Sequence, residues 1–358
     1  MKALVLAGGT GSRLRPLTHT SAKQLIPVAN KPVIYYGIED IAEAGIKEVG
    51  VIVGNETIDD VKKGLGDGSR WGINIEYIYQ EAPLGLAHCI KISEYFLANE
   101  RFIMYLGDNI LKGGLTEFVK DFERGKANAL ILLTEVSNPQ DFGVVELKED
   151  GQVKRLVEKP KEPPSNLALV GVYLFDRNIF QAVNSIEPSW RNELEITDAI
   201  QWLVDNGYTV ASHKVRGWWK DTGKPEDVLE ANRLVLSDLV REISDSAEID
   251  SKSRIIGEVK LSPGVEIRNS TVRGPATIGK DTKIIDSYIG PYTSIYYECE
   301  IIDSEIEYSI ILEKTKIREI STRLDWCLIG KEVEIYKNSG KPKGLNLTLG
   351  DRSRVGLI

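Results

Sequence analysis

The sequence predicts an α/β domain built around a mixed sheet, followed by a parallel β-helix. Up to about residue 225, short apolar runs alternate with amphipathic stretches, as in βαβ units. Beyond about residue 250, short segments rich in isoleucine and valine recur between polar and glycine positions, with hardly any helical periodicity. A chain of 358 residues has room for two domains, and we place their limits at 1–240 and 241–358.

Apolar runs in the N-terminal part predict the strands of a largely parallel sheet. Their sequences are KALVL, EVGVIV, INIEYIY, RFIMYL and ALILLTEV. Amphipathic stretches between them, at 37–44, after Gly85 and at 115–123, predict helices. In such sheets, sites gather at the carboxyl ends of the strands, so residues that directly follow a run are the first candidates for a site.

A second group of strands makes the predicted sheet mixed. Its members have hairpin-like spacing and are Gly143–Leu147, Val153–Glu158, Leu167–Phe175 and Tyr208–Val215. A predicted helix over Glu195–Asp205 interrupts the group. A further helical pattern, Pro225–Ile243, has proline near its first turn and predicts a connector between the domains.

Two superimposed periods predict the β-helix. The segments NSTV, DSYI and DSEI begin at Asn269, Asp286 and Asp303, which are 17 residues apart, about one turn of three short strands. Apolar residues within the turns step by six and should point to the axis: Val272, Ile278 and Ile284, then Ile289 and Ile295. Ordinary hairpins are the alternative, but two periods together favour the solenoid. The tail Tyr336–Ile358 could add a last irregular coil.

Composition excludes several classes of protein. The net charge of −8 argues against a nucleic-acid partner, because non-specific binding to DNA or RNA needs a surplus of lysine and arginine. Cys89, Cys299 and Cys327 are far apart and in no CxxC pair, so neither a disulfide framework nor a zinc site is indicated. The apolar run at the N-terminus, Ala3–Ala7, is too short for the core of a secretory signal peptide, and no apolar run approaches the length of a transmembrane helix. We therefore expect a cytoplasmic protein without a membrane partner.

A glycine-rich turn after the first strand predicts a phosphate-binding loop. It contains Gly8, Gly9 and Gly11 and leads to Arg13. Glycines let backbone N–H groups approach an anion without obstruction by Cβ. A dinucleotide fingerprint would need glycine where the chain has Leu14, and no Gly-Lys pair is followed by the serine or threonine of a Walker loop. For the glycines alone, a plain turn remains the alternative.

Two aspartates are candidate metal ligands. Asp108 follows the strand RFIMYL in the run LGDN, and Asp221 lies far downstream in WWKDTG. Mg²⁺ prefers oxygen ligands and usually takes one or two carboxylates, while water and substrate phosphate complete its coordination. An isolated strand-end aspartate is more often a helix cap or a turn residue, so the pair gains weight only together with the other motifs.

These motifs together resemble the signature of the sugar nucleotidyltransferases. The block GGTGSRLRPLTHTSAKQLIPVANKP joins the glycine-rich turn to Lys23 and to a Pro-Val-x-x-Lys-Pro ending. The resemblance extends along essentially the whole chain. It is closest to the long form of the thymidylyltransferase branch. The segment ELEITD, beginning at Glu193, is characteristic of that branch. It implies a Rossmann-like catalytic domain followed by a left-handed β-helix.

The resemblance also implies roles for individual residues. Arg13 and Lys23 would steady the leaving pyrophosphate, Lys159 would bind the sugar phosphate, and Asp108 and Asp221 would hold one Mg²⁺ on the α-phosphate. The other implied contacts are Gln80 and Gly85 at the base, Gly8, Gly9 and Gly11 at the nucleotide, and Gly143, Glu158 and Trp219 in the sugar pocket. A surface Glu-Lys-Pro turn is the alternative for Glu158 and Lys159 taken alone.

The implied reaction is the transfer of a nucleotidyl group from dTTP to glucose 1-phosphate, with release of pyrophosphate. The sugar phosphate would attack the α-phosphorus in line, without a covalent enzyme intermediate. The alternatives are UTP, another sugar 1-phosphate, or an added acetyltransferase activity in the β-helix. Acetyl transfer usually needs a histidine base, and all three histidines precede the repeats. A scaffold without activity is disfavoured because every charged catalytic position is filled. The β-helix is expected to serve structure or assembly in a homo-oligomer.

Overall fold

The structure is a computed structural model that describes residues 1–338, 340–341 and 344–356. The chain forms two units, each with its own core. The first comprises Met1–Thr10, Ala22–Leu25 and Val33–Asp221, and the second comprises Gly11–Ser21, Ile26–Pro32 and Thr222–Ile358. Among the described residues, no helix has the length and apolar character needed to cross a bilayer.

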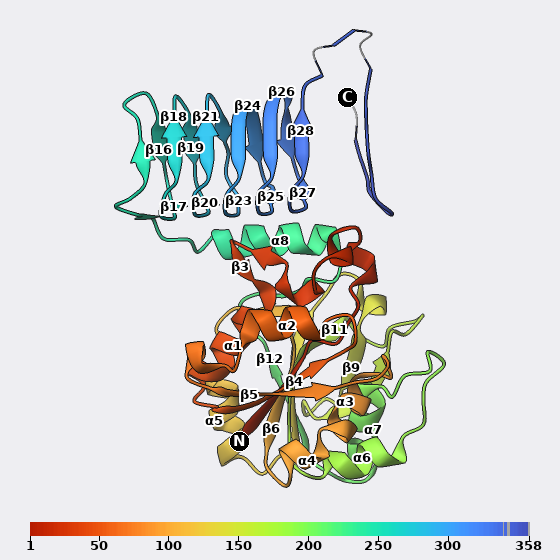
Figure 1. Ribbon diagram of the computed structural model, residues 1–358. Helices are drawn as coiled ribbons and strands as arrows, with labels where there is room; N and C mark the ends of the chain where they lie inside the picture. The colour runs from red at the N-terminus through yellow and green to blue at the C-terminus, as the bar shows by residue number, and fades with distance from the viewer. Residues whose placement is uncertain (339, 342–343, 357–358) are drawn as a thin grey trace. The chain divides into compact units, whose positions relative to one another are not determined.

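The first unit is built on a mixed sheet, which confirms the predicted fold class (Figure 1). The sheet runs in the order β10-β9-β11-β6-β1-β4-β5, and β8 joins β11 to β12. Its strands are β1 (Lys2–Leu6), β4 (Glu48–Val53), β5 (Asn74–Tyr79), β6 (Phe102–Leu106), β8 (Ala129–Glu135), β9 (Gly143–Leu147), β10 (Val153–Glu158), β11 (Leu167–Phe175) and β12 (Val210–Lys214). Neighbours β6, β1, β4 and β5 are parallel, whereas β11 runs antiparallel to β6 and β8.

Helices cover both faces of this sheet because successive side chains of a strand point to opposite faces. Ala3 and Val5 of β1 pack into one core cluster, and Leu4 and Leu6 into the other. The helices on the first face are α1 (Val33–Glu43), α2 (Ile58–Leu65) and α5 (Thr116–Arg124). Those on the second are α3 (Leu86–Ile92), α4 (Glu94–Leu97), α6 (Ile179–Ser185) and α7 (Ile196–Asp205). The predicted helices at 37–44 and 115–123 are thus confirmed, with small shifts of their limits.

Short elements complete the first unit and place its polar side chains. A two-stranded ladder pairs β7 (Asn109–Leu111) antiparallel with β13 (Trp219–Asp221). The 3-10 turns of this unit are η3 (Lys23–Leu25), η4 (Ser69–Trp71) and η5 (Pro139–Asp141). The β7–β13 ladder sets Asp221 opposite Asn109, the residue after Asp108, although the two aspartates are far apart in sequence.

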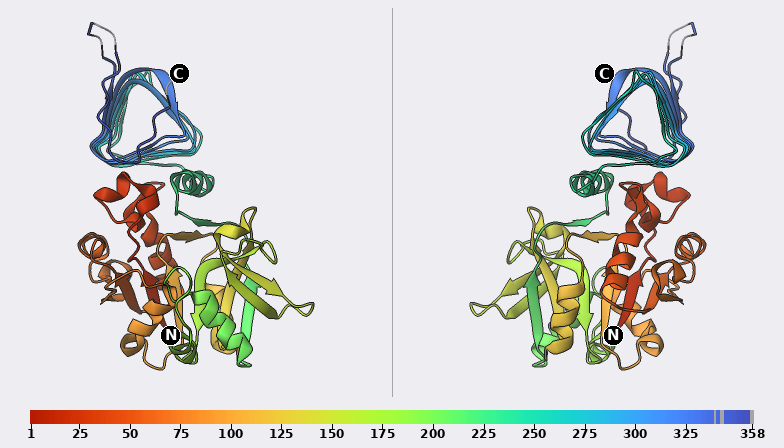
Figure 2. Two further views of the ribbon diagram at one scale, coloured as in Figure 1. Left: turned by 90° about the vertical axis from the view of Figure 1, so that its right-hand side faces the viewer. Right: turned by 90° about the vertical axis from the view of Figure 1, so that its left-hand side faces the viewer.

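The second unit contains the parallel β-helix, which confirms the second part of the predicted fold; Figure 2 shows its coils stacked with a triangular outline. Each coil pairs in parallel with the next, so that Thr271 lies opposite Tyr288 and Tyr288 opposite Glu305, 17 residues apart. The strands are β14 (Glu242–Ile243), β15 (Glu248–Ile249), β16 (Arg254–Ile256), β17 (Val259–Leu261), β18 (Glu266–Arg268), β19 (Thr271–Arg273), β20 (Ala276–Ile278), β21 (Lys283–Ile285), β22 (Tyr288–Ile289), β23 (Thr293–Ile295), β24 (Glu300–Glu307), β25 (Ile310–Ile311), β26 (Lys316–Asp325), β27 (Leu328–Ile329) and β28 (Glu334–Tyr336).

The repeated residues occupy the positions in the β-helix that their spacing predicts. The apolar set Val272, Ile278, Ile284, Ile289 and Ile295 is fully buried on the axis. The repeats begin with asparagine or aspartate in the left-handed region, at φ values of 44° for Asn269, 51° for Asp286 and 43° for Asp303. These residues tolerate that conformation better than other non-glycine residues. The serine that follows bonds between coils, as in Ser287 N to Ser270 Oγ at 3.0 Å.

One boundary prediction is wrong. The helix expected over Pro225–Ile243 ends earlier, as α8 (Pro225–Leu236), and Glu242–Ile243 is already strand β14. The backbone N–H of Arg241 donates to Glu258, and β14 pairs with β17, so the ladder of the β-helix replaces helical hydrogen bonds there. The tail forms no strand after Tyr336 in its described residues, and its irregular last coil stays a prediction.

Two segments of the signature belong to the second unit. The first contains the turns η1 (Ser12–Leu14) and η2 (Leu17–His19), and the second is the hairpin of β2 (Pro27–Val28) and β3 (Lys31–Pro32). Buried Asn232 of α8 holds this hairpin against the β-helix: its Oδ1 accepts from Ala29 N at 2.9 Å and from Ser294 Oγ at 2.7 Å. Asn30 Nδ2 donates to Ile295 O at 2.7 Å.

Candidate functional site

Polar residues gather where parallel strands of the first unit end. Gly8 follows β1, Gln80 follows β5, and Asp108 follows β6. A Cβ placed on Gly8 would lie 3.6 Å from Gln80 Oε1, so these two loops are in close contact. Gly107 N donates to Leu6 O at 2.9 Å, and a Cβ on Gly107 would lie 2.8 Å from that oxygen. The Leu-Gly-Asp run therefore needs glycine to let the β6 loop approach β1.

Lys23, Asp108 and Asp221 form a charged cluster at this edge. Lys23 Nζ makes an ion pair and hydrogen bond with Asp108 Oδ2 and lies 4.0 Å from Asp221 Oδ1. The lysine side chain is only 8% exposed. Its turn is held in place by Ala22 N, which donates to Asp60 Oδ2 at 3.1 Å. The structure thus brings together three of the predicted catalytic residues.

The charge of Asp108 is stabilised despite its burial. Desolvation alone would raise the pKa of this carboxyl group, but the ammonium of Lys23 and hydrogen bonds, including that of Asn109, outweigh it and lower the pKa. Asn109 Nδ2 donates to Asp108 Oδ1 at 2.7 Å, and Asn109 Oδ1 accepts from Trp219 Nε1 at 2.5 Å. Asp108 therefore stays ionised at neutral pH and is fixed in orientation.

Asp108 and Asp221 fit a magnesium site. Their carboxylates are brought together across the β7–β13 ladder and both face one cationic atom, Lys23 Nζ, which marks a position of negative potential. Two carboxylates and substrate phosphate are a usual oxygen set for Mg²⁺. No group of three or more histidine, cysteine or acidic residues with the geometry of a metal site occurs among the described residues.

Gln80 and Gly85 lie together. Gln80 is buried, and its Nε2 is 3.4 Å from Gly85 O and 3.1 Å from His88 Nδ1. Burial, followed by the charge of Lys91, lowers the pKa of His88, so the ring is neutral and can accept from the amide. Gly85 has φ +100°, and a Cβ there would lie 2.4 Å from Leu194 O. Only glycine allows the loop this close to the ELEITD segment.

The predicted sugar-pocket residues form a second cluster. Gly143 lies opposite Glu158 in the β9–β10 pair, and a Cβ on Gly143 would lie 3.1 Å from Glu158 Oε2. Glu158 Oε1 is 3.8 Å from Lys159 Nζ and 3.5 Å from Arg191 Nη1, and Thr197 donates to Oε2 at 3.4 Å. Lys159 takes a left-handed φ of 41° and exposes 40% of its side chain, so its ammonium is accessible to a ligand.

An aromatic bridge connects the two clusters. Trp219 donates to Asn109, and its ring packs edge-on against Phe142 with centroids 5.5 Å apart. Phe142 precedes Gly143 and accepts a bond from Lys159 N at 3.1 Å. Trp219 therefore links the carboxylate cluster to the Glu158 cluster, and its role in the sugar pocket stays a prediction.

Gly11 and Arg13 belong to the second unit, so their contribution to these clusters stays a prediction. Gly11 has φ +63° and caps the turn η1, where Leu14 N donates to Gly11 O at 2.8 Å. Thr18 Oγ1 donates to the same oxygen at 2.8 Å. Arg13 is exposed. The turn that carries the arginine is thus well defined within its own unit.

Sequence reasoning missed four residues of these clusters: Gln24, Asn109, Arg191 and Glu195. Gln24 is 3% exposed, its Oε1 accepts no hydrogen bond from a described residue, and its Nε2 lies 3.7 Å from a Cβ placed on Gly9. Arg191 also contacts Glu195, which is 4% exposed, at 3.4 Å. Gln24 and Asn109 each adjoin a predicted residue, and that adjacency was the available signal. Arg191 lies close in sequence to two of its partners, Glu193 and Glu195, but its contact with the distant Glu158 gave no signal.

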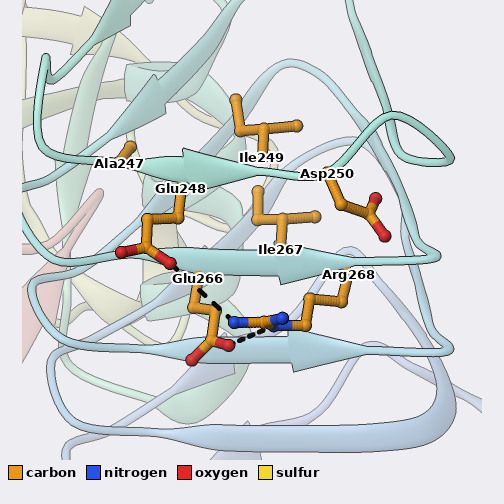
Figure 3. Close-up of a pocket in the computed structure, with 7 residues that line it drawn as sticks. All are labelled: Ala247, Glu248, Ile249, Asp250, Glu266, Ile267 and Arg268. Atoms are coloured by element: carbon orange, nitrogen blue, oxygen red, sulfur yellow. Dashed lines mark hydrogen bonds and ion pairs between the residues drawn. The ribbon is translucent and has the colours of Figure 1, made fainter.

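A shallow pocket lies elsewhere, on the first coils of the β-helix, and Figure 3 shows its lining. Its volume is about 410 Å³. The guanidinium of Arg268 pairs with Glu266 and lies 3.8 Å from Glu248. The third carboxylate of the lining, Asp250, accepts hydrogen bonds from Ser253 and from Asn269 N, so all three carboxylates have protein partners. We therefore place the candidate site at the strand ends of the first unit.

A change at Glu158 provides a test of the second cluster. Burial, then the charge of Glu195, raise the pKa of Glu158 above its ordinary 4.5 although Lys159 and Arg191 oppose this. A raised folded pKa gives stability that is present below the unfolded value and lost as pH rises through the folded one. We expect Glu158→Gln to increase the thermal midpoint more at pH 7 than at pH 4.5.

The same variant should raise the KM for the sugar phosphate about tenfold, because one charged hydrogen-bond partner is lost. Glu162→Gln, at an exposed position three residues beyond Lys159, is the control. A thermal shift that is the same at both pH values would contradict the raised pKa, and an unchanged KM would remove Glu158 from the pocket.

Comparisons with known proteins match both parts of the chain. A family model described as nucleotidyl transferase matches residues 2–238. The chain is 51% identical over 355 residues to a glucose-1-phosphate thymidylyltransferase of Streptomyces griseus, covering 99% of each. It is 47% identical over 362 residues to the low-salt glycan biosynthesis nucleotidyltransferase Agl11 of Haloferax volcanii, covering 100% of each. A solved structure of UDP-glucose pyrophosphorylase with UDP-glucose has TM-score 0.58 and 27% identity, covering 66% of this chain and 98% of that one.

Proposed function

The chain belongs to the nucleotidyl transferase family, and we propose that it transfers a nucleotidyl group from dTTP to glucose 1-phosphate, giving dTDP-glucose and pyrophosphate. The family match confirms the resemblance seen in the signature. The observation that supports the proposal best is the pairing of Lys23 with Asp108 and Asp221 at the strand ends, joined through Trp219 to the Glu158 cluster. One cluster suits a triphosphate and the other a sugar phosphate.

The proposed reaction is an in-line displacement at the α-phosphorus. The phosphate of glucose 1-phosphate is already an anionic nucleophile, so the protein's task is alignment and charge neutralisation. Lys159 holds the nucleophile, since its accessible ammonium lies beside Glu158. Lys23 and Arg13 stabilise the leaving pyrophosphate. Asp108 and Asp221 would hold Mg²⁺, which neutralises charge on the α-phosphate when bound.

Recognition of the base is assigned to Gln80 and Gly85. An amide can donate and accept together, which suits the edge of a pyrimidine that has an N3–H donor and carbonyl acceptors. The neutral ring of His88 orients the amide. Contact with the 5-methyl group favours dTTP over UTP by roughly 1–1.4 kcal/mol, or about five- to tenfold, so appreciable use of UTP is expected.

A matrix of sugar 1-phosphates against nucleoside triphosphates, with and without Mg²⁺, tests this function through pyrophosphate release. The expected optimum is dTTP with glucose 1-phosphate, with UTP about five- to tenfold poorer. Equal turnover of all four triphosphates would contradict the role of Gln80. A better sugar than glucose would move the enzyme to another branch of the family. No pyrophosphate from any pair would refute the function.

Further proposals concern the roles of the two parts of the chain, the location of the protein and its assembly. We assign catalysis to residues 1–240, supported by the family match to 2–238, and a structural role to 241–358. We also propose that the protein acts in the cytoplasm as a homo-oligomer. Sedimentation or light scattering checks the assembly, and a monomer at micromolar concentration would contradict it.

A further inference from the structure

The C-terminal tail contacts the signature within the second unit. Arg352 Nη1 donates to Ser12 O at 2.7 Å, and a Cβ placed on Gly350 would lie 3.5 Å from Pro16 Cβ. At the other end of the same segment, Lys331 Nζ donates to Thr20 O at 2.9 Å. Segment 11–21 is therefore held along its length by residues from the end of the chain. None of these contacts has a role in the reaction described above.

The contact of Arg352 acts on one particular peptide. The carbonyl of Ser12 and the N–H of Arg13 belong to the same planar unit, so a donor fixed on the oxygen also fixes the direction in which the Arg13 backbone leaves. A hydrogen bond from a charged donor is stronger than a neutral one. The side chain of Arg13 is exposed and begins at this peptide. The tail thus restrains the residue that carries the first cation of the signature.

The backbone of Arg352 is itself in an unusual conformation. Its φ is +65°, in the left-handed region that costs a non-glycine residue about 1 kcal/mol. Such residues persist where surrounding contacts hold them, often at functional positions. Ser353 N donates to Gly350 O, which closes the turn, and Arg354 pairs with Glu226 in the first turn of α8 at 3.4 Å. The hydrogen bond of Ser353 closes the turn that presents the guanidinium to Ser12, whereas the Arg354–Glu226 pair is solvent-exposed and contributes little.

We propose that Arg352 is a positioning residue for the triphosphate, acting through the Ser12–Arg13 peptide on the orientation of Arg13. The inference rests on the proposed role of Arg13 in holding the pyrophosphate part of the triphosphate. With the tail in place, Arg13 starts from one backbone orientation; without the bond, segment 11–21 samples others and triphosphate binding weakens. The sugar phosphate, assigned to Lys159 and Glu158 in the first unit, is unaffected.

Steady-state kinetics of point variants in the full chain test this. Arg352→Ala is expected to raise the KM for dTTP, and in the reverse reaction the KM for pyrophosphate, about tenfold. The kcat and the KM for glucose 1-phosphate should stay within about twofold of wild type. Arg352→Lys keeps a charged donor and should recover most of the loss. Arg354→Ala, two residues away and paired with Glu226 instead, is the matched control and should match wild type.

A double-mutant cycle with Arg13→Ala tests whether Arg352 acts through Arg13 or by an independent contact with phosphate. If Arg352 acts through Arg13, its replacement adds little in the Arg13→Ala background. Additive effects would overturn the proposal, because they indicate an independent contact with phosphate. An unchanged KM for dTTP in Arg352→Ala, or an equal rise for both substrates, would also overturn it. If Arg13→Ala has wild-type constants, the role assigned to Arg13 fails, whereas absence of turnover in the wild type would refute the proposed function itself.

Discussion

Replacing Asp108 by asparagine is expected to lower kcat by about 10³-fold, the usual loss when a preorganised electrostatic group is removed from a reacting centre. Asn keeps the size of the side chain but removes the charge that faces Lys23 Nζ and, with Asp221, would bind Mg²⁺. The lowered pKa of Asp108 means that the wild-type group is ionised throughout the neutral range, so the loss should not depend on pH between about 6 and 8. Pyrophosphate release at saturating substrates measures it.

Two further variants accompany the Asp108 experiment, one as a control and one at the second carboxylate. Asp150→Asn changes an exposed turn residue whose Oδ1 accepts from Gln152 N, and it should have wild-type activity. Asp221→Asn tests the second carboxylate at a side chain that is 29% exposed, where loss of charge disturbs folding less. Circular dichroism checks that each variant is folded. Near-normal turnover in either folded variant would remove that residue from the magnesium proposal.

Replacing Gly85 by alanine is expected to destabilise the protein by about 3 kcal/mol or more, because two costs add at this position. The backbone at φ +100° and ψ 170° lies in a region that is almost restricted to glycine. The new Cβ would also lie 2.4 Å from the backbone oxygen and 2.7 Å from the nitrogen of Leu194, neither of which can rotate away. The thermal midpoint should fall by roughly 6–12 °C.

Gly45→Ala is the matched control for Gly85→Ala. Gly45 has a similar φ of +83°, but nothing lies within 4 Å of its Cβ position, so only the left-handed penalty of about 1 kcal/mol applies. Any folded Gly85→Ala protein should also show a raised KM for dTTP, since Gly85 O lies beside the amide of Gln80. Equal thermal shifts in the two variants would contradict the predicted clash with Leu194.

Much of the fold could be predicted from local patterns. The steps of six and 17 residues act through nearest-neighbour coils, so the burial of Ile278 and Ile284 on the axis follows from spacing alone. The end of α8 could not be predicted in this way. Residues 237–243 continue a helical pattern, and only pairing of β14 with β17 makes the extended conformation more favourable.

The candidate site, too, could be predicted only in part from the sequence. The roles of Lys23, Asp108 and Asp221 were predicted from the resemblance of the whole signature, because a strand-end aspartate by itself is more often a helix cap or a turn residue. Arg191 and Asn109 were not predicted as site residues. Their importance arises from partners far apart in sequence, such as Glu158 for Arg191 and Trp219 for Asn109.

The sequence alone was enough to predict a mixed α/β region, a β-helix and a nucleotidyl transferase signature. Strand periodicity, repeat length and motif chemistry are local properties of the chain. Only the tertiary structure decided that Asp221 lies beside Asp108, that Leu194 forbids a side chain at Gly85, and that Arg352 reaches Ser12. These contacts join residues more than 100 positions apart. They depend on strand pairing and packing of the whole fold, which no short window of residues encodes.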